Sequence, residues 1–236
     1  MTSIRLLAAV PLALPAFLLV LSADTLATGD DPAEKKVELK RGDKVIFFGD
    51  SLTALAVKDA RVPDGKGYVP LVREALKDKG VDVDAVATGG HKVTDLLKRV
   101  DKDVLAKNPT VVVIQIGVND AGAGVTPEMF KEQLEELIGR LQKGGAKVIQ
   151  CTCTCRREGY DAKDAFDKKL DALADAARKI AKDKNLPLID LRAAFIAYWK
   201  KNNPDSKPNG VLTYDGNHWN ETGHKYVAEQ MLKKLQ

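Results

Sequence analysis

Histidine and cysteine are scarce in this 236-residue chain, and basic runs are absent. Three histidines are too few for the metal site of a metallophosphoesterase, which takes several histidines and aspartates as ligands. The 37 Lys and Arg residues are matched by 33 Asp and Glu residues that alternate with them, so nucleic-acid binding is not indicated. A composition of 44% hydrophobic and 30% charged residues instead fits one globular domain with a sizeable core.

The three cysteines lie close together, in QCTCTCRR, as Cys151, Cys153 and Cys155. An odd number cannot supply a framework of disulfides. On a strand, this period-two spacing puts all three side chains on one face, and we expect buried thiols at a sheet end. A disulfide within the trio is the alternative. Zinc is disfavoured, because Cys-x-Cys-x-Cys is not a usual ligand spacing.

The N-terminus differs from the rest of the chain. Within residues 4–21, a single Arg5 precedes an apolar run, and small residues follow the run. This pattern predicts a secretory signal peptide over residues 1–27, and hence a secreted or periplasmic protein without stable membrane association after cleavage. The alternative is an uncleaved anchor, since roughly 18 apolar residues approach the spanning length. Residues 28–43 are predicted as a charged linker, and residues 44–236 as the folded domain.

Strand-like and helix-like stretches alternate after the linker, which predicts a parallel sheet covered by helices on both faces. The run TVVVIQI has Gln115 as its one polar residue, so we expect a central strand. Residues 200–210 form the one long polar loop. The predicted strands are 44–48, 81–87, 110–116, 146–152 and 186–191, and the predicted helices are 68–80, 93–108, 126–145 and 164–185, with a final helix after residue 220.

Four stretches at strand ends or in late loops contain candidate catalytic residues. They are KVIFFGDSLT (44–53), ATGGHKVTD (87–95), IGVND (116–120) and YDGNHWNETGH (214–224). Each also has an ordinary interpretation as a turn or a helix cap. Together, however, they supply every group that acyl transfer by a serine requires.

That chemistry needs a nucleophile, a base, a group that orients the base, and donors to the oxyanion. Ser51 can attack, and His218 can take its proton at neutral pH. Asp215, three residues earlier, can reach one imidazole nitrogen while the other faces the serine. The backbone amides of Ser51 and Gly90 and the side-chain amide of Asn119 can converge on one oxygen.

These blocks resemble the signatures of the SGNH (GDSL-type) hydrolases, in order, over residues 44–236. The resemblance implies an α/β fold: a three-layer αβα sandwich, flavodoxin-like, with about five parallel strands. It implies an esterase or acyl hydrolase without a metal or other cofactor. It further implies Ser51 as nucleophile, Asp215 and His218 as the rest of the triad, and Gly90 and Asn119 as oxyanion donors beside the Ser51 amide.

Two neighbouring residues are predicted to bind substrate. His91 directly follows the glycine pair, and Trp219 directly follows His218, where it could stack on a sugar ring. Packing of Trp219 under the final helix is the alternative. The family often has an asparagine shortly before the oxyanion glycine; this chain reads DAVATGG, which leaves Gly89 as the alternative to Gly90.

Three further polar residues of the blocks receive structural assignments. His224 is expected to pack at the start of the last helix. Asp50 and Asp120 are expected to hold loops by hydrogen bonds.

Other functions are less well supported. An α/β-hydrolase elbow needs a second glycine where Thr53 stands. A non-catalytic carbohydrate-binding module would not need the intact set of site residues.

The substrate is expected to be a small-molecule or carbohydrate ester with a short acyl group, acetyl above others. The segments bordering the site are small and polar, and no apolar insertion could form a lid. A lysophospholipase or thioesterase on the same fold is the alternative, since a fold alone does not choose among ester substrates.

Overall fold

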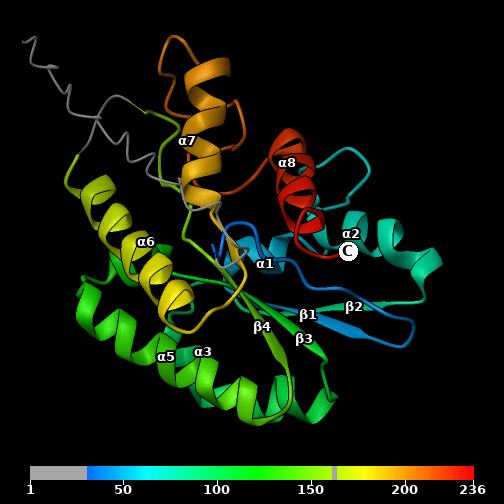
Figure 1. The fold of residues 1–236 in the computed structure, drawn as a ribbon. Helices are drawn as coiled ribbons and strands as arrows, with labels where there is room; N and C mark the ends of the chain where they lie inside the picture. The colour runs from blue at the N-terminus through cyan, green and yellow to red at the C-terminus, as the bar shows by residue number, and fades with distance from the viewer. Residues whose placement is uncertain (1–30, 161–163) are drawn as a thin grey trace, which may run out of the picture.

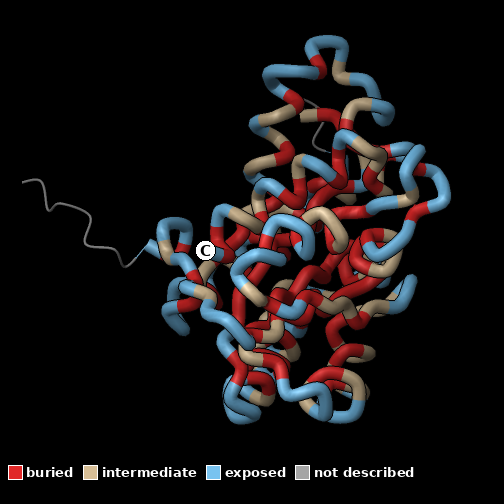
Figure 2. The backbone as a smooth tube through the Cα atoms, turned by 90° about the vertical axis from the view of Figure 1, so that its right-hand side faces the viewer, coloured by how far each residue is buried: buried red, intermediate tan, exposed pale blue. Residues whose placement is uncertain are grey.

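Five parallel strands form the centre of the computed structural model, which describes residues 31–160 and 164–236. Their order is β2-β1-β3-β4-β5, the flavodoxin-like order, so the predicted fold class is confirmed. The sheet lies in the buried middle of the molecule (Figure 2). The strands are β1 (Lys44–Gly49), β2 (Asp82–Ala87), β3 (Val111–Gln115), β4 (Lys147–Cys151) and β5 (Leu188–Ile189).

The central strand is β3, as its apolar run predicts. Every residue of β3 is buried, and it pairs with β1 on one side and β4 on the other. Val111 is in register with Val45 and with Lys147. A strand with a strand on each side and helices above and below has no solvated face, which explains the missing polar alternation.

Helices cover both faces of the sheet (Figure 1). One layer contains α3 (Val93–Arg99), α5 (Pro127–Lys143) and α6 (Ala165–Asp183). The other contains α2 (Tyr68–Leu76) and α8 (Glu221–Leu232), with α7 (Leu191–Asn202) packed beside α8. Helix α5 begins as predicted, with the Thr126 side chain accepting from Met129 N and Pro127 in the first turn.

Two stretches differ from the prediction. The expected strand 186–191 shortens to the two residues of β5, because Asp190 accepts a hydrogen bond from Ala193 N at 3.1 Å and caps α7. Helix α7 was not predicted, and it extends into the expected loop 200–210. The expected helix 93–108 is divided into α3, a wider turn at Val100–Val104 and a tighter turn at Leu105–Lys107.

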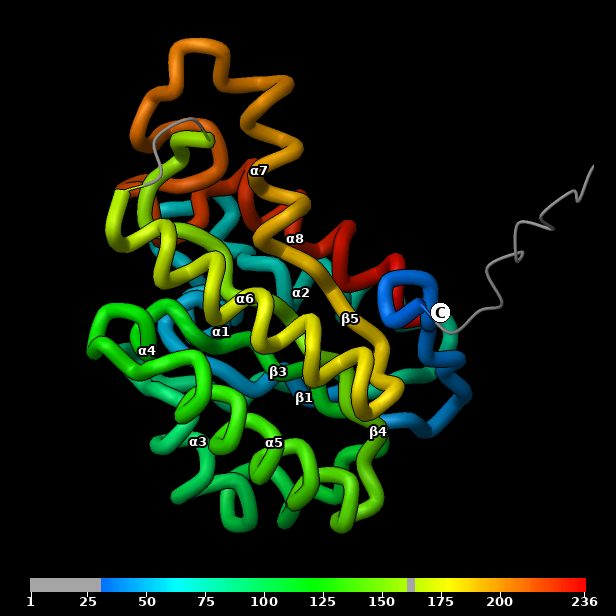
Figure 3. The backbone as a smooth tube through the Cα atoms, turned by 60° about the vertical axis from the view of Figure 1, so that its left-hand side comes forward, coloured from blue at the N-terminus to red at the C-terminus, as the bar shows by residue number. Residues whose placement is uncertain are grey.

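Residues 31–43 are not a free linker, so that prediction is wrong for this part of the chain. Val37 N donates to Lys234 O at 2.8 Å, and Gln236 N donates to Val37 O at 3.1 Å. Leu188 N donates to Pro32 O at 2.9 Å, beside the last strand. Figure 3 shows this segment, in blue, lying against the C-terminus. It therefore belongs to the folded domain.

The predicted signal peptide, residues 1–27, lies outside the described residues. In the two stretches that the structure describes, no helix is both long enough and apolar enough to cross a membrane.

The cysteines are buried and free, as expected, and the disulfide alternative is wrong. Cys151 ends β4, and the other two follow it. The Cys153 thiol donates to Leu170 O at 3.3 Å, and the Cys155 thiol donates to Gly216 O at 3.2 Å. Burial raises the pKa of Cys153 to about 12, so this sulfur stays protonated and unreactive at neutral pH.

Candidate active site

The predicted site residues meet at the carboxyl edge of the sheet, where β1 and β3 lie side by side. Crossovers leave these two strands in opposite directions, and this switch point is where open α/β sheets bind ligands. Ser51 begins the short helix α1 (Ser51–Leu55) directly after β1. A side chain at Gly49 would put its Cβ 2.3 Å from Gln115 O of β3, so only glycine allows this close turn.

Ser51, His218 and Asp215 form one hydrogen-bonded chain. His218 Nε2 lies 3.2 Å from Ser51 Oγ, and His218 Nδ1 lies 2.7 Å from Asp215 Oδ2. The other carboxylate oxygen accepts from the backbone N–H of His218 at 2.7 Å and of Asn217 at 3.0 Å. The aspartate therefore fixes both the ring and the loop that carries it.

The charge state of Asp215 sets the histidine tautomer. Burial raises its pKa, but hydrogen bonds from the His218 side chain and from the backbone amides of His218 and Asn217 outweigh that effect and lower the pKa to about 2. An ionised carboxylate only accepts, so Nδ1 carries the proton. Nε2 is then left as the acceptor that faces the Ser51 hydroxyl.

The predicted oxyanion donors lie next to Ser51. The turn at residues 88–91 closes with His91 N donating to Thr88 O, and Gly90 has φ +79°. A Cβ on Gly89 would lie 3.7 Å from Ser51 Cβ, whereas Gly90 lines a cavity together with Asn119. Gly89 therefore contacts the serine and Gly90 borders the cavity beside it, so the assignment of Gly90 as oxyanion donor stays a prediction.

Asn119 stands at the start of α4 (Val118–Gly122), after Gly117 at φ +127°. Its Nδ2 donates to the carbonyl of His91 at 3.0 Å and lies 3.4 Å from Asp50 Oδ2. The amide is thereby held between the two loops that flank the serine.

Asp50 and Asp120 are the loop-holding hydrogen bonders that the sequence suggests. Asp50 accepts from Leu52 N at 3.0 Å, and Asp120 accepts from Val93 N at 3.1 Å. Burial raises the pKa of Asp50 to about 7 against the opposing effect of the Leu52 amide, and burial likewise raises the pKa of Asp120 to about 6. Asp50 thus caps α1, and Asp120 connects α4 to the start of α3.

A buried carboxylate that the sequence did not point to anchors the triad loop. Glu158 is fully buried, and its Oε2 accepts from Val211 N at 2.7 Å. Its Oε1 accepts from Leu212 N at 2.6 Å, from the Thr213 hydroxyl at 2.8 Å and from Thr213 N. Glu158 thus fixes the backbone directly before Asp215. No local pattern could have shown this, because the partners are more than fifty positions away.

Trp219 is not a substrate-binding residue, and that prediction is corrected. Its side chain is 1% exposed and packs against Tyr68, Phe195 and His224, with ring centroids 5.7, 6.2 and 5.9 Å away. The indole is almost entirely removed from solvent, so a sugar cannot stack on it. His224 is buried in the same cluster, as expected, while substrate contact by His91 remains a prediction.

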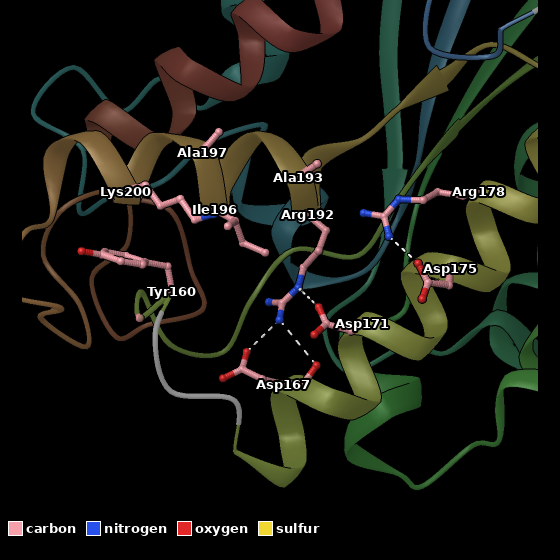
Figure 4. A pocket seen from close by; sticks show the side chains of 11 residues that line it. Tyr160, Asp167, Asp171, Asp175, Arg178, Arg192, Ala193, Ile196, Ala197 and Lys200 are labelled. Carbon is pink, nitrogen blue, oxygen red and sulfur yellow. Dashed lines mark hydrogen bonds and ion pairs between the residues drawn. The ribbon is translucent and has the colours of Figure 1, made fainter.

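Two cavities lie near these elements. One of about 340 Å³ adjoins the triad and is lined by Gly90, Asn119, Asn217, Lys92 and Arg156, among others. A larger one of about 520 Å³ lies between α6 and α7 (Figure 4). The larger cavity has an acidic wall whose charges are already paired with two arginines, so it offers no site of its own. The pairs are Arg192 with Asp167 and Asp171, and Arg178 with Asp175 and Asp190.

Metal binding has no support from the described residues. Among them, no group of three or more His, Cys, Asp or Glu side chains is arranged to hold a metal ion.

The serine, histidine and aspartate linked at the carboxyl edge of this parallel sheet are arranged as in the triad of a serine hydrolase. Residues 47–226 match the model of the GDSL-like Lipase/Acylhydrolase family, and the chain belongs to that family.

Similar proteins are esterases by name. An acetylxylan esterase of Geobacillus stearothermophilus is 27% identical over 220 residues, which are 84% of this chain and 96% of the relative. An arylesterase of Vibrio mimicus is 28% identical over 109 residues, 45% of this chain and 52% of the relative. The crystal structure of the acetyl xylan esterase AlAXEase is 39% identical with a TM-score of 0.74, covering 80% of this chain and 98% of that one.

Proposed function

We propose that this protein is a serine esterase that removes short acyl groups, acetyl above all, from a carbohydrate. The observation that carries the proposal is the hydrogen-bonded chain from Ser51 through His218 to Asp215. The acetyl and carbohydrate parts are supported by the two acetylxylan esterases that align with this chain over most of their length.

In the proposed reaction Ser51 Oγ attacks the ester carbonyl while His218 Nε2 takes its proton. The oxyanion accepts hydrogen bonds from the backbone amides of Ser51 and Gly90 and from Asn119 Nδ2. His218 then donates the proton to the leaving alcohol, and an acyl-serine remains. Water attacks that ester with His218 as base and releases the acid. Asp215 keeps the imidazole in the required tautomer throughout.

A short acyl group is supported by the lining of the cavity beside the triad. Its apolar side chains among the described residues are Val118 and Ala123, and neither can line a groove for a long chain. A lysophospholipase or a thioesterase for long acyl groups would need such a groove.

The test is the ratio of kcat/KM for p-nitrophenyl acetate, butyrate, octanoate and palmitate. We expect the maximum at acetate or butyrate. A maximum at octanoate or beyond would refute the short-acyl proposal, and activity that survives a serine-directed organophosphonate would refute the serine mechanism.

We also infer that the enzyme acts outside the cytoplasm, because the sequence predicts a signal peptide over residues 1–27. N-terminal sequencing of the protein recovered from its native host tests this: a chain that still begins at Met1 would contradict cleavage.

A further inference from the structure

The cavity beside the triad is connected to the reacting atoms. Gly90 and Asn119, both proposed oxyanion donors, form part of its wall. Asn217 lines it too, and Asn217 Nδ2 lies 3.5 Å from His218 Nε2. An ester whose carbonyl is at Ser51 can therefore extend into this cavity.

Two cationic side chains line the same cavity from different elements. Lys92 directly precedes α3, and Arg156 follows β4. The Arg156 guanidinium is held in place: its Cζ lies 5.0 Å from the centre of the Phe166 ring, and its Nη1 lies 3.9 Å from the point where a Cβ on Gly122 would be. Stacking on an aromatic face fixes the direction of a guanidinium at little cost in solvation.

Two carboxylates lie near Lys92 and lower its positive potential, but each is engaged elsewhere by a direct hydrogen bond. Asp95 accepts the backbone N–H of Lys92 at 3.1 Å and pairs with Lys98 Nζ at 3.1 Å. Asp120 is buried and bonds a backbone amide. Within residues 31–160 and 164–236, neither Lys92 nor Arg156 forms an ion pair, and no acidic side chain lines the cavity. A cleft lined by one sign of charge concentrates ligands of the opposite sign.

We propose that this cavity binds a carboxylate of the substrate, so that the enzyme prefers acetyl esters on uronate-bearing oligosaccharides over those on neutral ones. The inference rests on the proposed function and names its substrate class. Arg156 offers the paired N–H groups that match a carboxylate, and Lys92 adds a second positive charge to the same cavity. A glycan is favoured over a phospholipid because Val118 and Ala123 are the apolar lining residues among those described.

The experiment compares kcat/KM for two matched substrates, acetylated xylo-oligosaccharides with and without a glucuronic acid branch, at low and high salt. Wild-type enzyme is expected to prefer the acidic substrate about tenfold, as for one charge-assisted contact, and to lose most of this preference in 0.5 M NaCl. Arg156→Gln and Lys92→Gln are each expected to reduce the acidic-to-neutral ratio several-fold. Arg156→Lys should retain part of it.

Lys143→Gln is the matched control. It removes one positive charge at the end of α5, which enters β4 at the opposite edge of the sheet, and it should leave the ratio unchanged. A wild-type acidic-to-neutral ratio of kcat/KM near one would overturn the inference, and so would a ratio that neither Arg156→Gln nor Lys92→Gln lowers. In both cases, hydrolysis of the neutral substrate would leave the proposed function intact. No hydrolysis of either oligosaccharide would refute the proposed function itself. More efficient hydrolysis of a lysophosphatidylglycerol would show that the anion is a lipid phosphate.

Discussion

Glu158→Ala should destabilise the protein and disturb the triad loop together. The substitution removes the acceptor of four hydrogen bonds, from Val211 N, Leu212 N, Thr213 N and the Thr213 hydroxyl. Each buried donor left without a partner costs about 1–3 kcal/mol, and water entering the vacated space satisfies some of them. We therefore expect the free energy of unfolding to fall by about 4 kcal/mol, a large part of the stability of an ordinary domain.

Urea denaturation followed by circular dichroism measures this loss, and p-nitrophenyl acetate hydrolysis measures the effect on the site. Because His218 must stay within hydrogen-bond distance of Ser51, a shift of the loop should lower kcat about tenfold or more in the variant that remains folded. Glu158→Gln keeps one acceptor oxygen but turns its amide NH₂ toward a backbone N–H. We therefore expect an intermediate decrease in the free energy of unfolding, of about 2 kcal/mol.

The matched control is Glu136→Ala. Glu136 is an exposed residue of α5 that lies 3.9 Å from Arg140, and its removal should cost less than about 1 kcal/mol. If Glu158→Ala were as stable as Glu136→Ala, the carboxylate would not anchor the loop, and the reasoning would be wrong.

Three further predictions follow from the site and its surroundings. Ser51→Ala and His218→Ala should each reduce kcat/KM by about 10⁴-fold, with the double variant little worse; a tenth of the activity retained in folded Ser51→Ala would exclude the nucleophile. Asn119→Ala should lower kcat about 10²- to 10³-fold with KM little changed, and a change confined to KM would instead indicate ground-state binding. Hydrogen bonds from Arg61 lower the pKa of buried Asp59 to about 2. The ionised Asp59 carboxylate therefore contributes fully to the free energy of unfolding above about pH 4, and this contribution is lost as the pH falls toward 2. Asp59→Asn should thus be less stable than wild type by about 1–2 kcal/mol at pH 7 and nearly equal to it at pH 2; a difference independent of pH would contradict this.

Local patterns were sufficient for most of the architecture. The run 110–116 is short, apolar and rich in β-branched residues, which favours a strand buried on both faces. Its alternation with amphipathic helices favours a covered parallel sheet. The same logic failed at α7 because Asp190, which reads as part of a strand, acts as a helix cap. It also failed at residues 31–43, whose charged composition hides the backbone pairing of Val37 with the C-terminus.

The sequence by itself determined which residues could perform acyl transfer, since Ser51, Asn119, Asp215 and His218 stand in blocks whose residue types and order fit that chemistry. Only the tertiary structure decided how close they lie, because Ser51 and His218 are 167 positions apart and meet through the topology of the sheet. The same holds for Trp219. Its position beside the catalytic histidine suggested substrate contact, but the packing of α2, α7 and α8 buries it. Residue type and spacing report what a side chain can do, whereas burial and neighbours depend on contacts between segments far apart in the chain.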